Sequence, residues 1–226
     1  MSNTSVQIVQ EFIEEVFNRK NYDRAFDYCI EDCVFHLAPY VGLGADFDDR
    51  SGDKLVLVDV APNGPAAGNL QIGDELVRVT DGAKTWQTFK ELKGVSWGQG
   101  ALGTSITVTV NRGGTLMDIP ITRGRVEGFD IILSKSIDRW RDYTLKYWPD
   151  SRAEIQLIFG DADHVACYSI NSGTQQEYQR SAVWADCSIY RLENGKIVES
   201  WGVEDSFAQL KQLGYQINEP VIEPSA

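Results

Sequence analysis

The stretch Cys187-Ser-Ile-Tyr-Arg-Leu-Glu-Asn-Gly-Lys-Ile-Val-Glu-Ser-Trp-Gly-Val-Glu-Asp205 decides the fold of this chain. Its apolar residues alternate with polar ones on both sides of Asn194-Gly195, as they do in half-buried strands. Asn-Gly supplies the positive φ angles that a tight reversal needs, so Ser181–Arg191 and Lys196–Val203 are predicted to form a hairpin. An amphipathic helix, Ser206–Leu213, is predicted to follow and to end at a glycine.

The segments on either side of this hairpin indicate helices and further strands. Apolar residues recur at helical spacing in two stretches near the N-terminus and in one long stretch before Pro149. The predicted helices are Val6–Phe17, Tyr22–Cys29 and Ile132–Trp148, and the predicted strands are Cys33–Leu37, Ala153–Phe159 and His164–Asn171. Together they predict an α+β fold in which helices pack on a curved antiparallel sheet.

The sequence between Val41 and Gly124 has a different character. Glycine is frequent there, and short β-branched runs are divided by turn residues such as Pro62-Asn63-Gly64. The predicted strands are Lys54–Val60, Glu75–Val79, Ser105–Asn111 and Met117–Thr122, with one helix at Trp86–Leu92. This pattern predicts a small barrel or sandwich with its own core. The predicted domains are 1–40 and 125–218 for the outer part, 41–124 for the insert and 219–226 for a tail.

Composition and charge narrow the classes of partner. The chain has 33 acidic and 21 basic residues, a net charge of −12, and no run of Lys or Arg. Nucleic acid and anionic membrane surfaces require concentrated positive charge, so neither is expected as a partner. The sequence has neither a signal-peptide apolar block nor a run of roughly 20 apolar residues, so a cytoplasmic location is predicted.

Cysteine and histidine content argues against a metal or cofactor. The four cysteines, Cys29, Cys33, Cys167 and Cys187, form no CxxC pair, and the chain has two histidines. Structural zinc requires closely spaced soft ligands, so free thiols and no metal are expected. No cofactor is predicted.

The quoted stretch and the helix after it resemble the C-terminal signature of SnoaL-like polyketide cyclases, in the nuclear transport factor 2-like superfamily. The segment Val9–Pro39, with Val34-Phe35-His36, and the long helix before Trp148-Pro149-Asp150 are also similar to that family. The resemblance implies a cone whose curved sheet wraps around a pocket for a small hydrophobic ligand. It also implies a homodimer that forms through the open sheet face.

The insert resembles a PDZ domain of the bacterial protease-associated kind. The similar pieces are Pro62-Asn-Gly-Pro-Ala-Ala67, Leu70-Gln-Ile-Gly-Asp-Glu-Leu76 and a closing strand into Asn111-Arg-Gly-Gly114. Gly42-Leu43-Gly44, followed by Ala45, stands where the family's carboxylate-binding loop belongs. Such a loop would bind the C-terminus of a peptide, although the acidic run Asp46–Asp49 departs from that role. A structural insertion or a lid is the alternative.

Two residues are candidates for acid–base chemistry. The resemblance implies that Asp205 can move a proton to or from carbon next to a carbonyl, and that His36 faces the cavity. Asp205 would equally suit the N-cap of the helix that follows, and a lone strand histidine is commonly a core residue. Glu199, Trp201, Val203 and Asp205 are predicted to share one face of their strand, and Glu204 is predicted to face the other side.

Aromatic residues on the outer segments are candidate walls of the pocket. They are Trp140, Tyr143, Tyr168, Trp184 and Trp201, and the same rings would serve an ordinary core. Two functions follow from the sequence. The first is a cofactor-independent cyclase or isomerase acting on a small hydrophobic carbonyl compound. The second is a protein without enzymatic activity that binds a peptide or another ligand through its insert, with the cone as scaffold.

Overall fold

The chain forms two compact units in a computed structural model, which describes residues 4–49, 52–93, 97–127 and 129–216. The first unit combines Met1–His36 with Ile131–Ala226, and the second unit is Leu37–Asp130. In the sequence, the second unit is therefore one continuous segment inserted between the two segments that form the first unit. The predicted insert, 41–124, falls within the second unit, and the predicted tail, 219–226, lies outside the described residues.

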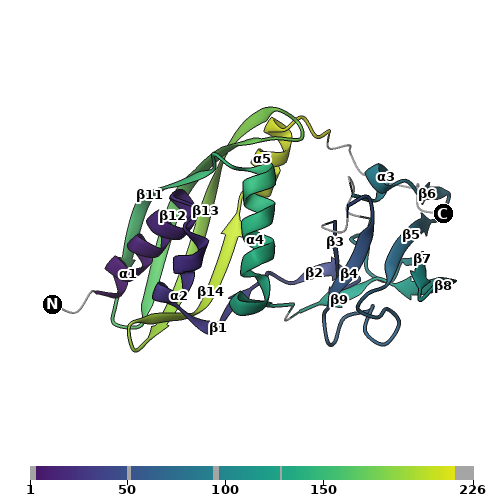
Figure 1. Ribbon diagram of the computed structural model, residues 1–226, viewed down its shortest axis with the longest axis horizontal. Helices are drawn as coiled ribbons and strands as arrows, with labels where there is room; N and C mark the ends of the chain where they lie inside the picture. Colours follow the sequence, from purple (N-terminus) through teal and green to yellow (C-terminus); the bar gives the residue numbers. More distant parts are fainter. Residues whose placement is uncertain (1–3, 50–51, 94–96, 128, 217–226) are drawn as a thin grey trace, which may run out of the picture. The chain divides into compact units, whose positions relative to one another are not determined.

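The first unit is built on a six-stranded sheet in the order β10-β1-β14-β13-β12-β11 (Figure 1). Its strands are β1 (Cys29–His36), β10 (Ile131–Ile132), β11 (Arg152–Gly160), β12 (His164–Gln175), β13 (Arg180–Glu193) and β14 (Lys196–Glu204). β1 runs parallel to β14, and the other neighbouring pairs are antiparallel. The predicted hairpin is confirmed, with positive φ at both Asn194 and Gly195.

Helices cover one side of this sheet. They are α1 (Ser5–Phe12), the π-helical turn η1 (Ile13–Asn18), the 3-10 turn η2 (Tyr22–Arg24), α2 (Ala25–Tyr28), α4 (Leu133–Tyr147) and α5 (Ser206–Gln212). Phe12 is fully buried at the centre of the core, with its ring edge-on to Phe17, Tyr28 and Tyr190. The sheet side that carries Tyr190 is called the core-facing side below, and the opposite side is called the outer face.

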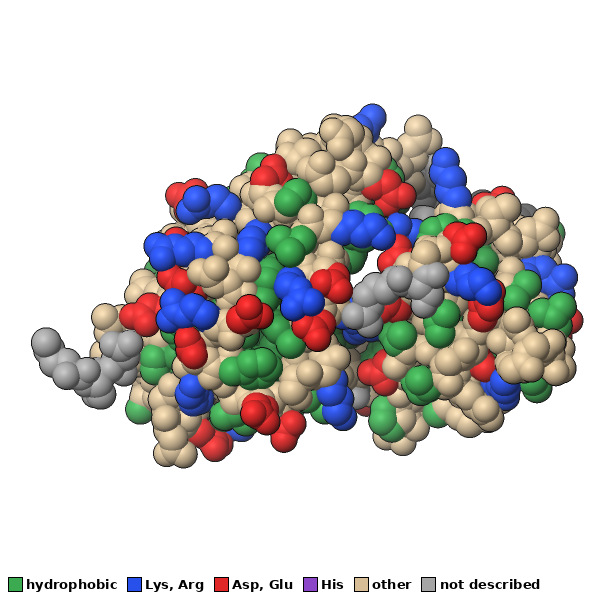
Figure 2. All heavy atoms as spheres, in the orientation of Figure 1, with side chains coloured by type: hydrophobic (Ala, Val, Ile, Leu, Met, Phe, Trp, Pro, Cys, Tyr) green, Lys and Arg blue, Asp and Glu red, His purple; other side chains and the backbone are tan. Residues whose placement is uncertain are grey.

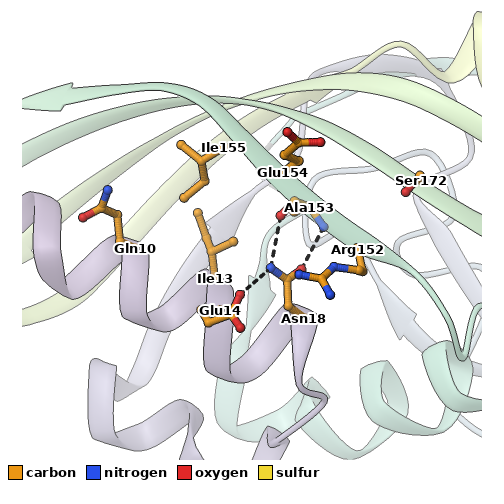
Figure 3. A pocket seen from close by; sticks show the side chains of 9 residues that line it. All are labelled: Gln10, Ile13, Glu14, Asn18, Arg152, Ala153, Glu154, Ile155 and Ser172. Atoms are coloured by element: carbon orange, nitrogen blue, oxygen red, sulfur yellow. Dashed lines mark hydrogen bonds between the residues drawn. The ribbon is translucent and has the colours of Figure 1, made fainter.

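The first predicted helix differs from the structure in its last turns, which are π-helical. A π turn leaves the i→i−4 hydrogen-bond pattern, and here it ends at Asn18. The Asn18 amide bonds both backbone groups of Ala153 on β11: Nδ2 donates to the carbonyl at 3.1 Å, and Oδ1 accepts from the N–H at 2.8 Å (Figure 3). Because β11 ends the sheet, this side chain occupies backbone groups of an edge strand.

The second unit is a β-rich module with a core of its own. Five strands lie in the order β3-β4-β5-β7-β8, β6 pairs with β5, and β2 pairs with β9. The elements are β2 (Tyr40–Gly42), β3 (Ala45–Asp48), β4 (Leu55–Val60), β5 (Glu75–Asp81), β6 (Lys84–Trp86), α3 (Phe89–Lys93), β7 (Ser105–Arg112), β8 (Thr115–Thr122) and β9 (Gly124–Val126). Leu57, Val79 and Val108 are fully buried in it. Asp74, 1% exposed, accepts two hydrogen bonds from Arg112 at 2.7 and 2.6 Å.

Charges of both signs are mixed on the face that Figure 2 shows, where Lys and Arg side chains lie among Asp and Glu side chains. This distribution accords with the sequence, in which basic residues are scattered. Within the described part of the chain, no helix has both the length and the apolar character needed to cross a bilayer.

Candidate functional site

The structure divides the residues predicted to form one site between the two faces of the sheet. His36 is the register partner of Trp201, Trp201 is the partner of Ile189, and all three belong to the outer face. The His36 and Trp201 rings stack 4.8 Å apart, and His36 Nε2 lies 3.7 Å from Glu199 Oε1. Trp201 is 39% exposed. This face is directed away from the core cluster of α1.

Asp205 caps a helix. Its Oδ1 accepts a hydrogen bond from the backbone N–H of Ala208 at 2.9 Å, at the start of α5. Its own N–H donates to the carbonyl of Ala185 on β13. The structure thus shows the N-cap alternative for this residue, which satisfies an N–H that a helix start leaves without a partner.

The predicted aromatic residues also separate. Trp140 packs in the core, with its ring 4.7 Å from Phe17 and 5.3 Å from Tyr22. Tyr168 pairs with Cys187 on the outer face, so it is not near Trp140. Trp184 and Tyr143 are the two that approach a carboxylate on the core-facing side. The side chains that converge there are those of Asp186, Glu204, Ser188 and Trp184.

Asp186 and Glu204 are direct register partners on β13 and β14. Cβ atoms at such positions lie roughly 5 Å apart, and two like charges opposite each other destabilise a sheet. Each carboxylate has a donor: Ser188 Oγ donates to Asp186 Oδ1 at 2.8 Å, and Trp184 Nε1 donates to Glu204 Oε2 at 3.1 Å. Ser206 Oγ also donates to Glu204, at 3.2 Å.

The environment of Asp186 favours its neutral form. Burial raises the pKa of the carboxyl above its ordinary value, and the negative charge of Glu204 adds to the rise, while the Ser188 hydrogen bond opposes it. Tyr143, on α4, is half exposed; burial of the remainder and, to a smaller extent, the Glu204 charge raise the pKa of its phenol. A carboxyl whose pKa is raised above that of a second carboxyl beside it can divide acid and base roles with it.

The sequence contained a signal for Asp186 that the prediction did not use. Asp186 has the same parity along β13 as Trp184 and Tyr190, both of which are buried. Aspartate is depleted in strands, so an aspartate on the buried parity between two aromatic residues is unusual. The sequence did not show whether the odd-numbered or the even-numbered residues of β14 point toward the core.

Two other features of the described residues have the outline of a site. A hollow between η1 and β11 is lined by Gln10, Ile13, Glu14, Asn18 and Arg152 to Ile155 together with Ser172 (Figure 3). The Asn18 amide there is already bonded to Ala153 and to Glu14. Asp161, Asp163 and His164 come within ligand distance of one another at an exposed turn, where Asp161 Oδ1 accepts the backbone N–H groups of the other two. Those bonds account for both arrangements.

In the second unit, the loop Gly42-Leu43-Gly44 is tightly held. Gly44 has a φ of +72°, and an added Cβ would lie 2.8 Å from Ala61 Cβ. The Leu43 carbonyl accepts from Ala66, and the Gly44 carbonyl accepts from Ala61, both at 2.8 Å. Burial raises the pKa of the Tyr40 phenol, and the nearby Gly44 N–H opposes that rise. Ala45 begins β3, which pairs only with β4 and forms one edge of the sheet.

Comparison with known proteins finds a likeness in the second part of the first unit. Residues 135–213 match the family model described as SnoaL-like polyketide cyclase. This segment includes most of α4 and all of β11 to β14. It therefore contains both Asp186 and Glu204. The match supports the predicted SnoaL-like character of this part of the chain. The PDZ-like character of the insert stays a prediction.

Solved structures give weaker likenesses, and a search of curated proteins finds no significant match. Wild-type IdmH from Streptomyces antibioticus is 16% identical over 94% of this chain and 100% of its own, with a TM-score of 0.46. An NTF2-like protein of unknown function from Burkholderia pseudomallei is 11% identical over 94% and 99%, with a TM-score of 0.44. A SnoaL-like polyketide cyclase from Agrobacterium tumefaciens is 25% identical over 34% and 69%, with a TM-score of 0.31. Residues 135–213 are thus the part of the chain for which a family likeness is found.

Proposed function

We propose that the first unit is a cofactor-independent acid–base catalyst, a cyclase or isomerase acting on a small hydrophobic carbonyl compound. The carboxyl pair Asp186 and Glu204 carries this proposal, because one member has a raised pKa and the other lies directly opposite it. The SnoaL-like match over residues 135–213 supports the same class of chemistry. The rings of Trp184 and Tyr143 provide apolar surface beside the pair.

The two carboxyls take different steps. Glu204 acts as the base and removes a proton from the carbon next to the substrate carbonyl. Asp186, neutral, donates its proton to the carbonyl oxygen as negative charge develops there, so the product of this step is an enol. Return of the proton to a different atom completes an isomerisation, and attack of the enol carbon on a second carbonyl completes an aldol cyclisation.

The test is proton exchange. The purified protein is incubated in D₂O with a panel of aromatic ketones and polyketones, and deuterium uptake at the carbon next to the carbonyl is followed by mass spectrometry. Asp186→Asn and Glu204→Gln should each lower the exchange rate by about 10²-fold or more, the usual contribution of a general acid or base. Asp205→Ser and His36→Gln serve as matched variants. If these two abolish exchange and the first two do not, the pair first predicted from the sequence is the acid–base pair.

We also propose that the partner at the outer face is a second copy of the chain. Seven large apolar side chains are exposed on it: Leu157, Phe159, Tyr168, Val183, Ile189, Trp201 and Val203. At about half exposure each they offer on the order of 500 Å² of apolar surface, which matches the apolar share of the roughly 800 Å² that each partner buries in a standard interface. Arg191 and Glu199 on the same face neutralise each other through a 2.5 Å contact. This pair therefore adds no net charge to the face.

Light scattering tests this interface. Ile189→Glu places a charge in the middle of the face and should convert a dimer of the wild-type chain to a monomer. Glu193→Gln, at the end of the same strand, is a control that should leave the mass unchanged. A wild-type chain that is monomeric at micromolar concentration contradicts the proposal.

Peptide binding by the second unit is the alternative function, favoured by the edge position of β3 next to the Gly42–Gly44 loop. A peptide could add to that edge as an extra strand, with its terminal carboxylate at the loop. Because the Tyr40 hydroxyl lies near the Gly44 N–H and would compete for it, Tyr40→Phe should strengthen binding of peptides with free C-termini, and Gly44→Trp should abolish it. The absence of binding by a peptide library to both the wild-type chain and Tyr40→Phe would exclude this function.

A further inference from the structure

A buried tyrosine lies at the inner end of a hydrogen-bonded row on β13. Tyr190 is 5% exposed, and its ring packs edge-on against Phe12 in the core. Residues 186, 188 and 190 alternate onto the same side of the strand, so their side chains follow one another along the core-facing side. The hydroxyl of Ser188 donates to Asp186 Oδ1, and it lies near enough to the Tyr190 hydroxyl to lower the pKa of that phenol.

The direction of these hydrogen bonds follows from donor counting. A serine hydroxyl has one hydrogen, and that of Ser188 is donated to Asp186 Oδ1 at 2.8 Å. Ser188 Oγ is therefore left as an acceptor that the nearby Tyr190 phenol can use. Ionisation of Tyr190 is strongly disfavoured, because burial raises the pKa of the phenol far above its ordinary range. The phenol consequently stays a donor at any working pH.

Space for the serine is provided by the neighbouring strand. Gly202 on β14 is the register partner of Ser188, and a Cβ at Gly202 would lie 3.2 Å from Ser188 Oγ. A larger residue at that position would press on the hydroxyl. The glycine therefore leaves Ser188 in place between Tyr190 and Asp186.

We propose that Ser188 and Tyr190 are positioning residues, which fix the carboxyl of Asp186 so that Oδ1 accepts the serine hydrogen and Oδ2 carries the proton toward the substrate. A carboxylic acid has one hydrogen, and the oxygen that accepts a strong hydrogen bond is the one that does not bear it. The row thereby selects the reacting oxygen of Asp186. This inference rests on the proposed function, and it assigns roles to two residues outside the carboxyl pair.

Two groups act directly on the pKa of Asp186: Glu204 on β14 and Ser188 on β13. The charge of Asp186 in turn raises the pKa of Cys167 on β12 and of Tyr190 on β13, and that of Glu204 raises the pKa of Tyr143 on α4. Of these, Ser188 is the one whose hydrogen bond stabilises the ionised carboxyl. Its removal should therefore raise the pKa of Asp186 further. Removal of the Tyr190 hydroxyl should act in the same direction but less strongly, because it acts through Ser188.

Carbon-detected NMR of the Asp186 carboxyl tests the inference without any substrate. Ser188→Ala and Tyr190→Phe should move its titration to higher pH, Ser188→Thr should restore it, and Ser200→Ala should leave it unchanged. Ser200 is a matched control, since it is a buried serine on the core-facing side of β14 and is the register partner of Tyr190. An unchanged titration in Ser188→Ala, or an equal shift in Ser200→Ala, overturns the proposal. Should Ser188→Ala fail to fold, Tyr190→Phe and Ser188→Thr decide the same question.

Turnover gives the second readout. If the exchange reaction is found, Ser188→Ala should lower kcat about tenfold with little change in KM, because one charge-assisted hydrogen bond acts on the reacting carboxyl and not on substrate binding. A rise in KM at constant kcat would contradict a positioning role. A shifted titration in a protein without exchange activity would leave the hydrogen-bonded row established and refute the proposed chemistry.

Discussion

Asp186 is expected to reduce the stability of the folded chain at neutral pH. Its folded pKa is raised above the ordinary value of 3.8, so the folded state binds its proton more tightly than the unfolded state does. The resulting stability is fully present below pH 3.8 and is lost as the pH rises through the folded pKa. Asp186→Asn removes this loss of stability, because asparagine does not ionise.

Asp186→Asn should therefore raise the unfolding midpoint at pH 7, and the difference from wild type should vanish as the pH falls toward 3.8. Thermal unfolding followed by circular dichroism at several pH values measures it. A variant that is less stable than wild type at pH 7 would mean that Asp186 makes a structural contact that outweighs its burial cost.

Asp205, unlike Asp186, is expected to stabilise the folded chain, because it caps a helix. Asp205→Ala removes the bond to the Ala208 N–H and should cost about 1 kcal/mol of unfolding free energy. Asp205→Ser, which keeps a capping oxygen, should be close to wild type. Urea unfolding of both variants, with exchange assays in parallel, separates this capping role from a catalytic one, since catalysis by Asp205 would be lost in both.

At the scale of elements, the edge of β11 is protected by one side chain. Asn18→Ala removes two hydrogen bonds to the backbone of Ala153 and should cost about 1–2 kcal/mol. Amide hydrogen exchange at Ala153 should become faster in this variant. Gln10→Ala, in the same hollow, is the control and should leave that amide unaffected, and equal rates in all three proteins would contradict the role of Asn18.

At the scale of the whole molecule, the two units have separate cores. Phe12 is fully buried in the first unit, and Leu57 is fully buried in the second. Phe12→Ala should destabilise the first unit by about 3–5 kcal/mol, and Leu57→Ala the second by about 2–5 kcal/mol. Hydrogen exchange followed by mass spectrometry, with peptides from each unit, reads the two effects separately. Equal loss of protection in both units of either variant would show that they unfold together.

Local sequence determined much of the fold. Asn194-Gly195 fixes a hairpin because its φ angles are a property of those two residues, and the strands on either side alternate as predicted. The helix from Leu133 to Tyr147 and most strands of the second unit were similarly predictable from periodicity. The π turn at Ile13–Asn18 was not, because it depends on where Asn18 meets β11, more than a hundred residues later in the chain.

The candidate site shows what local sequence leaves open. Alternation correctly placed Glu204 on the opposite side of the strand from Trp201. Alternation does not say which of these two residues points toward the core. That choice depends on which side of the completed sheet α1 covers, a contact between residues about two hundred positions apart. The outer face also carries seven exposed large apolar side chains, so hydrophobicity alone does not distinguish the sides.

The sequence by itself determined the α+β character of the chain, the hairpin, the continuous insert and the SnoaL-like segment, since each depends on residues close together along the chain. Only the tertiary structure decided that Asp186 and Glu204 meet while His36 and Trp201 stack on the other side. The physical reason is that strand pairing brings distant carboxyls together, and helix packing decides which of them lose water. Burial, and with it the raised pKa of Asp186, is a property of the assembled sheet.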